Sequence, residues 1–371
     1  VIDHDLTLTA STLAANGQQI FCCDDESNRI FTDPACFPIA IPTNDTFYSQ
    51  YDQTCLDFVR RAPSPSSECY REQMNTLTHI IDGSQVYGST DDKARFLRTF
   101  KGENYLTTGI FSHLINGNIY LFEKLGDVRV NEQPGLTMIQ NLLLREHNRI
   151  ADILQKLNPK WRDEIVYQES RRIVAAEIQH ITYNEWLPLI LGRSVMKEFN
   201  ILPKFYGFSN NYNTRINPNI INSFATAAYR FHTLIQVNII EVGYDIYITN
   251  HLFQEKTLPY GMDLISLNIQ RGRDHGLPGY NVFRKVCGLN PINSFKDLEQ
   301  IMQNGSAQTF STLYKTVDDI DLFIAGNHEK PLPDAVVGPT FACILAEQAR
   351  RTKLGDRFWY ENGNFRHSFS A

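Results

Sequence analysis

Apolar residues recur at helical spacing through about fifty residues in the middle of the chain. From Gly135 they fall three or four positions apart until Asn158 and Pro159, a pair that typically ends a helix. The same period continues from about residue 161 to 185, ahead of Pro188. We predict two long helices, each with a buried face, the second ended by Pro188. The residues on these faces are Leu136, Ile139, Leu142, Leu143, Ile150, Ile153, Leu154, Ile165, Ile173, Val174, Ile178 and Ile181.

Other parts of the chain show the same helical period, whereas strand-like alternation is short. The further helical segments are 220–234, 279–286, 294–303 and 340–351, and the alternating ones are 80–87 and 238–248. The sequence contains no internal repeat. We therefore predict a mainly α fold with little β structure, in a single domain over residues 1–371.

Charge and hydropathy exclude two classes of partner. The 371 residues include 35 Lys and Arg against 41 Asp and Glu, a net charge of −6, so no basic excess is available to bind a phosphate backbone. No apolar run approaches the roughly 18 residues that cross a bilayer. We expect neither a nucleic-acid partner nor a membrane span.

Most of the seven cysteines lie in a turn-rich N-terminal stretch. Because they lack the Cys-x-x-Cys spacing typical of structural zinc, disulfides are favoured over a zinc site. Cys287 and Cys343 are plausible long-range partners, which leaves Cys69 as an odd thiol. The four N-terminal cysteines are Cys22, Cys23, Cys36 and Cys55.

Two glycosylation sequons, like the cysteines, are typical of secreted proteins. Asn44 and Asn304 each begin an Asn-x-Ser/Thr sequon in polar, turn-like surroundings. Together with the predicted disulfides, they favour a secreted, extracellular glycoprotein.

Two patterns of oxygen donors suggest a cation site. His4 stands between Asp3 and Asp5, which is either a solvated acidic terminus or an imidazole beside carboxylates that bind a cation. Further along, the side chains of Thr78, Asp82 and Ser84 would turn their oxygens to one side of an extended backbone, and the backbone carbonyl of Ile80 would complete a row of the hard donors that Ca²⁺ prefers. The alternative is a strand that ends in an Asp82-Gly83 turn. The residues of this second pattern are Thr78, Ile80, Asp82 and Ser84.

Three histidines and one asparagine could have either a functional or a structural role. His232 ends an apolar helical pattern, where an imidazole either binds iron or is a hydrogen-bonded core histidine. Asn268 is either the acceptor for the other ring proton of such a ligand or an ordinary capping residue. We interpret His147 as part of a solvated or interhelical polar face, and His275 as a structural residue in a glycine-containing loop.

Taken in order, six segments resemble the animal-type haem peroxidases, and the resemblance extends over nearly the entire chain. The segments are 3–5, 77–89, 126–132, 142–149, 232–235 and 266–280, and they include the strings LLREHNR at 143–149 and NIQRGRDHG at 268–276. Within the family, the chain is most similar to secreted invertebrate members of the peroxinectin and chorion-peroxidase kind. The resemblance implies a mainly helical domain around a covalently attached haem b.

The resemblance also assigns roles to individual residues. His4 matches the distal histidine that moves a proton between the oxygens of H₂O₂, and Arg129 matches the distal arginine that stabilises the departing oxygen. His232 matches the proximal iron ligand, Asn268 the acceptor of its ring N–H, and Arg271 the partner of a haem propionate.

Two further sets of residues match covalent and cation-binding positions of the family. Asp3 and Glu132 match the carboxylates that form esters with haem methyl groups, so haem should resist extraction. The Ca²⁺ ion is expected beside the distal histidine, with Asp5, Thr78, Ile80, Asp82 and Ser84 as its ligands.

The family resemblance implies a donor:hydrogen-peroxide oxidoreductase. Such an enzyme reduces H₂O₂ and oxidises phenols, tyrosyl groups or (pseudo)halides through an oxyferryl intermediate. The alternative is a secreted adhesion or matrix protein that keeps the scaffold, has reduced or lost turnover, and binds a cell-surface or matrix partner. A cyclooxygenase-like dioxygenase would need a radical-forming tyrosine near the proximal histidine, for which Tyr229 is only a formal candidate.

This sequence departs from the family pattern at several places. It begins inside the distal motif, so we expect an N-terminally truncated domain, and the segments near 114–126 and 237–248 are shorter than is usual in the family. Phe231 stands where the family has glycine, and Arg230 is displaced by one position. Gln133 replaces a methionine that bonds to haem in some relatives, so no third covalent link is expected.

Overall fold

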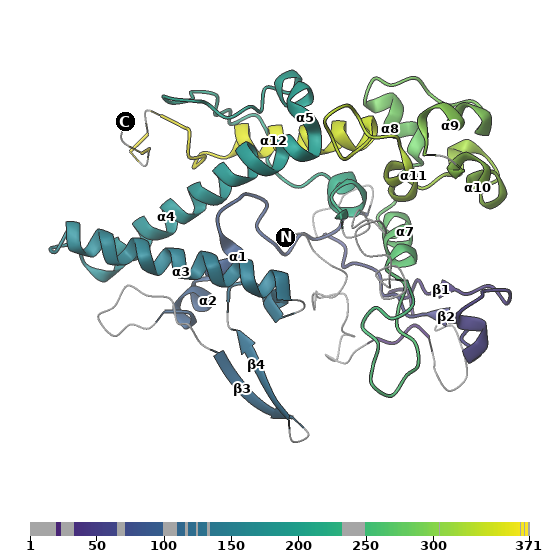
Figure 1. Ribbon diagram of the computed structural model, residues 1–371, viewed down its shortest axis with the longest axis horizontal. Helices are drawn as coiled ribbons and strands as arrows, with labels where there is room; N and C mark the ends of the chain where they lie inside the picture. Colours follow the sequence, from purple (N-terminus) through teal and green to yellow (C-terminus); the bar gives the residue numbers. More distant parts are fainter. Residues whose placement is uncertain are drawn as a thin grey trace.

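In the computed structural model, the described residues form a mainly helical protein with two small antiparallel strand pairs (Figure 1). The predicted fold class is therefore confirmed. The described residues are 20–23, 33–64, 71–98, 110–115, 118–123, 125–131, 134–231, 249–303, 305–363, 365–366 and 368–369.

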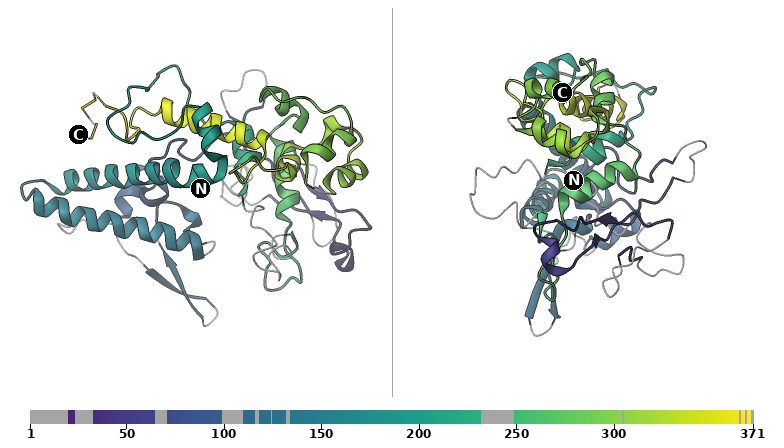
Figure 2. Two further views of the ribbon diagram at one scale, coloured as in Figure 1. Left: turned by 45° about the horizontal axis from the view of Figure 1, so that its top comes forward. Right: turned by 90° about the vertical axis from the view of Figure 1, so that its right-hand side faces the viewer.

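The two longest helices after residue 130 are the predicted ones. Helix α3 spans Pro134–Leu157, helix α4 spans Asp163–Ile181, and they lie side by side and antiparallel (Figures 1 and 2). Leu144 and Ile150 of α3 and Val174 of α4 are buried in one apolar cluster. Val86, Tyr87 and Val130 pack on this helix pair as part of the same cluster.

Only part of the apolar surface predicted for these helices is buried. Ile139, Leu142 and Ile153 of α3 are 51%, 61% and 43% exposed, and Ile165 and Ile181 of α4 are similarly accessible. The helical period therefore predicted the helices correctly, but the apolar stripe is wider than the side that faces the neighbouring elements. The expectation that these residues are buried is wrong.

The chain does not break at Pro188. Helix α4 continues through a π-helical turn, η3 (Thr182–Trp186), into α5 (Leu187–Glu198). Pro188 lies in the first turn of α5, directly after the π-helical turn. The irregularity comes instead at Gly192, whose φ of +73° is disfavoured for other residues.

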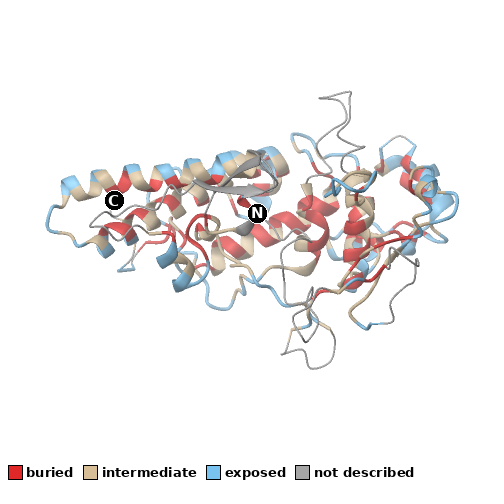
Figure 3. Cartoon of the chain, turned by 90° about the horizontal axis from the view of Figure 1, so that it is seen from below, coloured by how far each residue is buried: buried red, intermediate tan, exposed pale blue. Residues whose placement is uncertain are grey.

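The largest part of the core surrounds the last long helix, α12 (Pro339–Gly355). It packs on α5 and on η4, a π-helical segment at Phe224–Ala228, and most of its buried residues are apolar. Figure 3 shows buried residues concentrated where the helices meet and exposed residues on their outer faces. Of the predicted helix at 220–234, residues 222–228 are helical, residues 229–231 are not part of that helix, and residues 232–234 lie outside the described residues.

The C-terminal half adds short helices around this core. The predictions at 279–286, 294–303 and 340–351 are confirmed by α8, α9 and α12. The remaining helical elements are η1 Tyr48–Tyr51, α1 Ser84–Tyr87, α2 Asp91–Phe96, η2 Val128–Asn131, α7 Leu264–Asp274, α8 Tyr280–Val286, α9 Phe295–Ile301, α10 Ser306–Leu313, η6 Val317–Asp319 and α11 Leu322–His328.

Both strand pairs are antiparallel, and neither was predicted. Strand β1 (Ile39–Ala40) pairs with β2 (Cys55–Leu56), and β3 (Ile110–Ile115) pairs with β4 (Asn118–Glu123). The predicted strand at 80–87 is wrong, because Gly83 has a φ of +75° and the helix α1 begins at the next residue. The other predicted strand, 238–248, lies outside the described residues.

Disulfides join the cysteines as the sequence suggested. Two of them staple the N-terminal stretch, Cys22 to Cys36 and Cys23 to Cys55. The long-range pair Cys287–Cys343 is also confirmed, and it joins the end of α8 to α12. Asn44 of the first sequon is exposed, whereas Asn304 and Cys69 lie outside the described residues.

The disulfides should differ in how much they stabilise the fold. Replacing both Cys287 and Cys343 by serine should lower the free energy of unfolding by about 4 kcal/mol, because this bridge restricts a long loop of the unfolded chain. The same change at Cys22 and Cys36, which are only 14 residues apart, should cost about 3 kcal/mol. Urea unfolding of both variants tests this order, and a larger loss from the shorter loop would contradict it.

Candidate functional site

A cavity of about 220 Å³ lies between the 77–85 segment and η2 on one side and η3, η4 and α12 on the other. Its walls are largely apolar and aromatic, with one buried guanidinium, that of Arg129. The polar loop before α1 forms another part of the wall. The residues that characterise these walls are Thr78, Ile80, Ser84, Asp127, Arg129, Trp186, Phe224 and Tyr229.

Arg129 is held in one orientation by a neighbouring carboxylate. Its Nε lies 2.9 Å from Oδ1 of Asp127, and its Nη2 lies 2.6 Å from Oδ2, so the two groups form a bidentate pair. The Arg129 side chain is 1% exposed and that of Asp127 is 9% exposed. The guanidinium is therefore fixed at the cavity wall before any ligand arrives.

The backbone around this pair is anchored to α1. The N–H of Gly126 donates to the carbonyl of Val86, and the N–H of Asp127 donates to the carbonyl of Gln85, each at 3.0 Å. Gly126 approaches α1 so closely that a Cβ there would clash with the carbonyl oxygen of Ser84. Glycine is thus required where the Arg129 segment meets the loop of the expected calcium ligands.

The charge of the Asp127–Arg129 pair also has a defined pH dependence. Burial by itself raises the pKa of Asp127, but the hydrogen bonds and positive charge of Arg129 outweigh it, and the net shift is downward. Asp127 is therefore ionised throughout the neutral range. Asp127 and Arg129 are therefore both charged in the folded protein near pH 7.

The described ligands of the expected calcium site lie on the loop that leads into α1. Asp82 accepts the N–H of Ser84 at 2.9 Å through Oδ1, and Thr78 Oγ1 lies 3.3 Å from Ser89 Oγ. Ile80 is on the same loop, while Asp5 lies outside the described residues. Among the described residues, no group of three or more His, Cys, Asp and Glu side chains is arranged to hold a metal. Calcium binding therefore stays a prediction.

Asn268 lies on α7 and is completely buried. Its Oδ1 accepts a hydrogen bond from Nη1 of Arg230, the residue that is displaced by one position from the family pattern. Its Nδ2 has no hydrogen-bond acceptor in the structure as described. The oxygen predicted to accept the ring N–H of His232 is therefore bound here by an arginine, and His232 itself lies outside the described residues.

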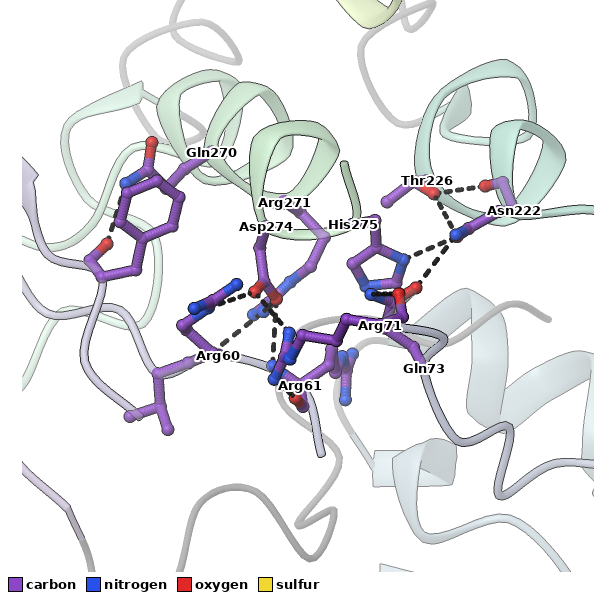
Figure 4. Close-up of polar contacts among 12 residues, drawn as sticks. Arg60, Arg61, Arg71, Gln73, Asn222, Thr226, Gln270, Arg271, Asp274 and His275 are labelled. Atoms are coloured by element: carbon purple, nitrogen blue, oxygen red, sulfur yellow. Dashed lines mark hydrogen bonds and ion pairs between the residues drawn. The ribbon is translucent and has the colours of Figure 1, made fainter. Parts of the chain in front are cut away.

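Arg271 belongs to a cluster of arginines around one carboxylate (Figure 4). Asp274 accepts from Arg60 Nε at 2.8 Å, from the Arg61 N–H at 2.9 Å, from Arg71 Nη1 at 3.2 Å and from Arg271 Nη1 at 3.0 Å. Burial raises the pKa of Asp274, but these hydrogen bonds and charges more than reverse the effect. The propionate-binding role predicted for Arg271 is not tested, and its described contacts fix α7 to the 59–71 segment.

His275 follows this cluster and keeps the structural role predicted for it. Its Nδ1 lies 2.7 Å from Oδ1 of Asn222, and Figure 4 shows the ring turned toward that amide. Burial and the nearby charge of Arg271 lower its pKa to about 3, so the ring is neutral at physiological pH. His275 is the C-terminal cap of α7 rather than part of an open loop.

His147 is buried rather than solvated. Its side chain is 0% exposed, and its Nδ1 lies 3.0 Å from the hydroxyl oxygen of Tyr87. The interhelical part of the prediction is correct, because Tyr87 is on α1 and the ring of Tyr167 on α4 packs edge-on against His147. The sequence carried a signal for this burial, since His147 stands three positions from both Leu144 and Ile150, which are core residues.

The remaining predicted site residues cannot be placed. His4, Asp3 and Glu132 lie outside the described residues, as Asp5 and His232 do. Of the predicted set, the structure therefore places Arg129, Asn268, Arg271 and the calcium-loop residues. Sequence reasoning missed Asp127, although its position two residues before Arg129 permits a local hydrogen-bonded pair.

Comparison with known proteins finds relatives that match nearly the whole chain. The family model described as animal haem peroxidase matches residues 1–245 and 240–371. The chain is 36% identical to the chorion peroxidase of Drosophila melanogaster over 430 residues, 98% of this chain and 52% of that protein. It is 33% identical to mouse (Mus musculus) myeloperoxidase over 434 residues, 97% of this chain and 59% of that protein.

A solved structure shows the same fold. Peroxidase A from Dictyostelium discoideum superimposes with a TM-score of 0.71 and 29% identity, covering 89% of this chain and 76% of that one. The chain spans about half the length of the curated relatives it matches. In the described part of this chain, no helix has both the length and the apolar character needed to cross a membrane.

The Asp127–Arg129 pair should stabilise the fold in a pH-dependent way. Asp127→Asn should lower the free energy of unfolding at pH 7 by about 3–5 kcal/mol, because it leaves a buried guanidinium without its carboxylate. Since the pKa of Asp127 is lowered on folding, the wild-type advantage should persist down to about pH 4 and shrink as the pH falls further.

Urea unfolding between pH 7 and pH 3 measures this difference. Glu146→Gln is the matched control, because Glu146 pairs with the exposed Arg149 and should change the urea midpoint little. A wild-type advantage over Asp127→Asn that stays constant to pH 3 would contradict the assigned titration.

Proposed function

This chain belongs to the animal haem peroxidase family, and we propose that it reduces H₂O₂ and oxidises small reducing substrates. The substrates we propose are phenols, tyrosyl groups or (pseudo)halides. The observation that carries the proposal is the buried guanidinium of Arg129, locked by Asp127 at the wall of an aromatic cavity. A fixed positive charge in such a place stabilises negative charge that develops on a departing oxygen.

The described walls of the cavity carry groups that would contact a porphyrin. Trp186, Phe224 and Tyr229 supply flat apolar surface, and Arg129 supplies the charge. A haem bound here would supply the redox chemistry by which peroxide is reduced.

We assign the remaining roles by the match of motifs. His232 would hold the haem iron, Asp3 and Glu132 would attach the macrocycle through ester bonds, and Arg271 would lie near a propionate. His4 would take a proton from one oxygen of H₂O₂ and deliver it to the other. Arg129 would meet the departing oxygen without moving, since Asp127 already orients it.

We further propose that calcium binds beside the cavity. Its ligands would be Asp5 and the loop oxygens of Thr78, Ile80, Asp82 and Ser84, which are hard oxygen donors of the kind that calcium prefers. Thr78, Ile80 and Ser84 line the same cavity as Arg129. An ion on this loop would therefore stiffen the wall at which peroxide reacts.

Three disulfides and an exposed sequon at Asn44 support a secreted glycoprotein. Disulfides of this number are typical of oxidising compartments. The name of one relative, chorion peroxidase, is compatible with an extracellular site of action for this chain as well.

One observation favours a second candidate, a secreted adhesion or matrix protein with reduced or lost turnover. Arg230 binds Oδ1 of Asn268, the atom expected to accept the ring proton of His232. Because Arg230 takes one of the two lone pairs of this oxygen, the proximal imidazole would share its acceptor with a cation, which would make the imidazole less basic. The scaffold would then serve a cell-surface or matrix partner rather than rapid peroxide turnover.

Replacing Arg129 tests the proposed enzyme directly. In haem-containing protein, Arg129→Gln should reduce kcat/KM for H₂O₂ about 10²- to 10³-fold with guaiacol as donor, as removal of a fixed oxyanion donor does elsewhere. Stopped-flow mixing with peroxide measures the rate. Arg149→Gln, an exposed arginine on α3, is the control that should keep the wild-type rate.

An Arg129→Gln enzyme within twofold of wild type would contradict the role given to this side chain. A colourless full-length chain that is inert toward peroxide but supports cell attachment would instead favour the adhesion protein. Near-ultraviolet circular dichroism of each variant establishes that the fold is retained.

Calcium should stabilise the native chain through Asp82. A ligand that binds only the folded state at one hundred times its Kd adds about 2.7 kcal/mol, so chelation should lower the melting temperature of wild type. Asp82→Asn should melt lower with calcium present and should no longer respond to chelation. Asp92→Asn, which changes an exposed carboxylate of α2, should respond as wild type does; an unchanged response in Asp82→Asn would contradict the site.

A further inference from the structure

A phenol and an imidazole are hydrogen-bonded to each other in the core behind the cavity wall. The hydroxyl oxygen of Tyr87 and Nδ1 of His147 are 3.0 Å apart, and both side chains are 0% exposed. The ring of Tyr167 packs edge-on against both, with centroids 6.2 Å from Tyr87 and 5.3 Å from His147. The proposed reaction with peroxide assigns no role to this pair.

The pair is coupled to the cavity by close packing. Tyr87 is on the same short helix as Ser84 and Gln85, which line the cavity. Its ring lies directly behind Gly83, where a Cβ would come within 3.0 Å of a ring carbon. Ile178 lines the cavity and also packs on the apolar cluster that contains Tyr87. Tyr87 therefore shares its helix and its apolar packing with residues that line the cavity proposed for haem.

The chemistry of a buried phenol depends on where its proton can go. Burial raises the pKa of Tyr87 well above the usual value, so the group is neutral and keeps its proton. Loss of one electron makes a phenol strongly acidic, so its proton must pass to a nearby group as the radical forms. Oxidation is therefore favourable only if a base within hydrogen-bond reach accepts the proton as the electron leaves. Nδ1 of His147 is such a base when its ring proton is on Nε2.

A second buried tyrosine provides an internal comparison. Tyr183 lines the cavity and is 1% exposed, but its hydroxyl donates to the peptide carbonyl of Ala349 at 2.6 Å. A carbonyl accepts a hydrogen bond but is far too weak a base to keep the proton. If proximity to the cavity decided which tyrosine is oxidised, the cavity-lining Tyr183 and Tyr229 would be favoured, whereas proton acceptance favours Tyr87.

We propose that Tyr87 and His147 form an internal redox site that takes an oxidising equivalent from the peroxide-oxidised haem. One electron passes from Tyr87 to the haem, the phenolic O–H bond breaks, and the proton binds to Nδ1 of His147. The products are a neutral phenoxyl radical, an imidazolium, and a haem reduced by one electron. This inference rests on the proposed function, because peroxide and haem supply the oxidant.

Freeze-quench electron paramagnetic resonance of the haem-containing full chain tests the site. After H₂O₂ is added, a tyrosyl radical should form whose spectrum narrows when the protein contains ring-deuterated tyrosine. Tyr87→Phe should lose this signal. His147→Gln should also lose it although Tyr87 is present, because the amide cannot take the proton. Tyr183→Phe should retain it.

A radical that survives in Tyr87→Phe or His147→Gln would overturn the proposal, as would its loss in Tyr183→Phe. A second oxidant shows whether a missing radical reflects failure of this inference or failure of the proposed peroxidase function. Photogenerated tris(bipyridine)ruthenium(III) removes an electron from the purified chain without peroxide or haem. If peroxide leaves the haem spectrum unchanged, the peroxidase proposal fails, and the ruthenium experiment with the same variants still decides whether Tyr87 and His147 act together.

Discussion

The bidentate pair between Arg129 and Asp127 is the interaction on which the geometry of the cavity depends. Removing a guanidinium from water is costly, and the structure offsets this cost with a carboxylate on the same short turn. Two backbone hydrogen bonds then tie this turn to α1, which packs on α3. The segment that carries Arg129 is thus attached through α1 to α3, which packs on α4. A positive charge held in this way costs no reorganisation when negative charge appears beside it.

A second carboxylate, that of Asp274, also orients arginine side chains through hydrogen bonds. Asp274 gathers hydrogen bonds from the 60–71 segment and from Arg271 on its own helix, and so joins parts of the chain about 200 residues apart. In both places one ionised carboxylate orients arginine side chains. The contacts of Arg230 with Asn268 belong to this second region, and they bear on whether the proximal side favours turnover or a binding role alone.

The sequence predicted what depends on local pattern and missed what depends on distant partners. Helices α3, α4, α8, α9 and α12 and the Cys287–Cys343 disulfide were predictable, because periodicity and cysteine context report them directly. The strand expected at 80–87 is wrong because alternation does not reveal the positive φ of Gly83. Burial of His147 was missed although its spacing from Leu144 and Ile150 indicates it, whereas its partner Tyr87, 60 residues away, is known only from the structure. The resemblance predicted a role for Arg129 at the cavity, and the structure adds its pair with Asp127, which the spacing of two residues permits.

Haem binding opposite Arg129 is tested most directly by the absorption spectrum of the purified full-length chain, recorded before and after extraction with acidified organic solvent. We expect a Soret band that stays with the protein after extraction in wild type, because Asp3 and Glu132 would attach the haem covalently, and no such band in His232→Ala. A folded wild-type chain that shows no Soret band, even after incubation with added haem, would contradict the assignment.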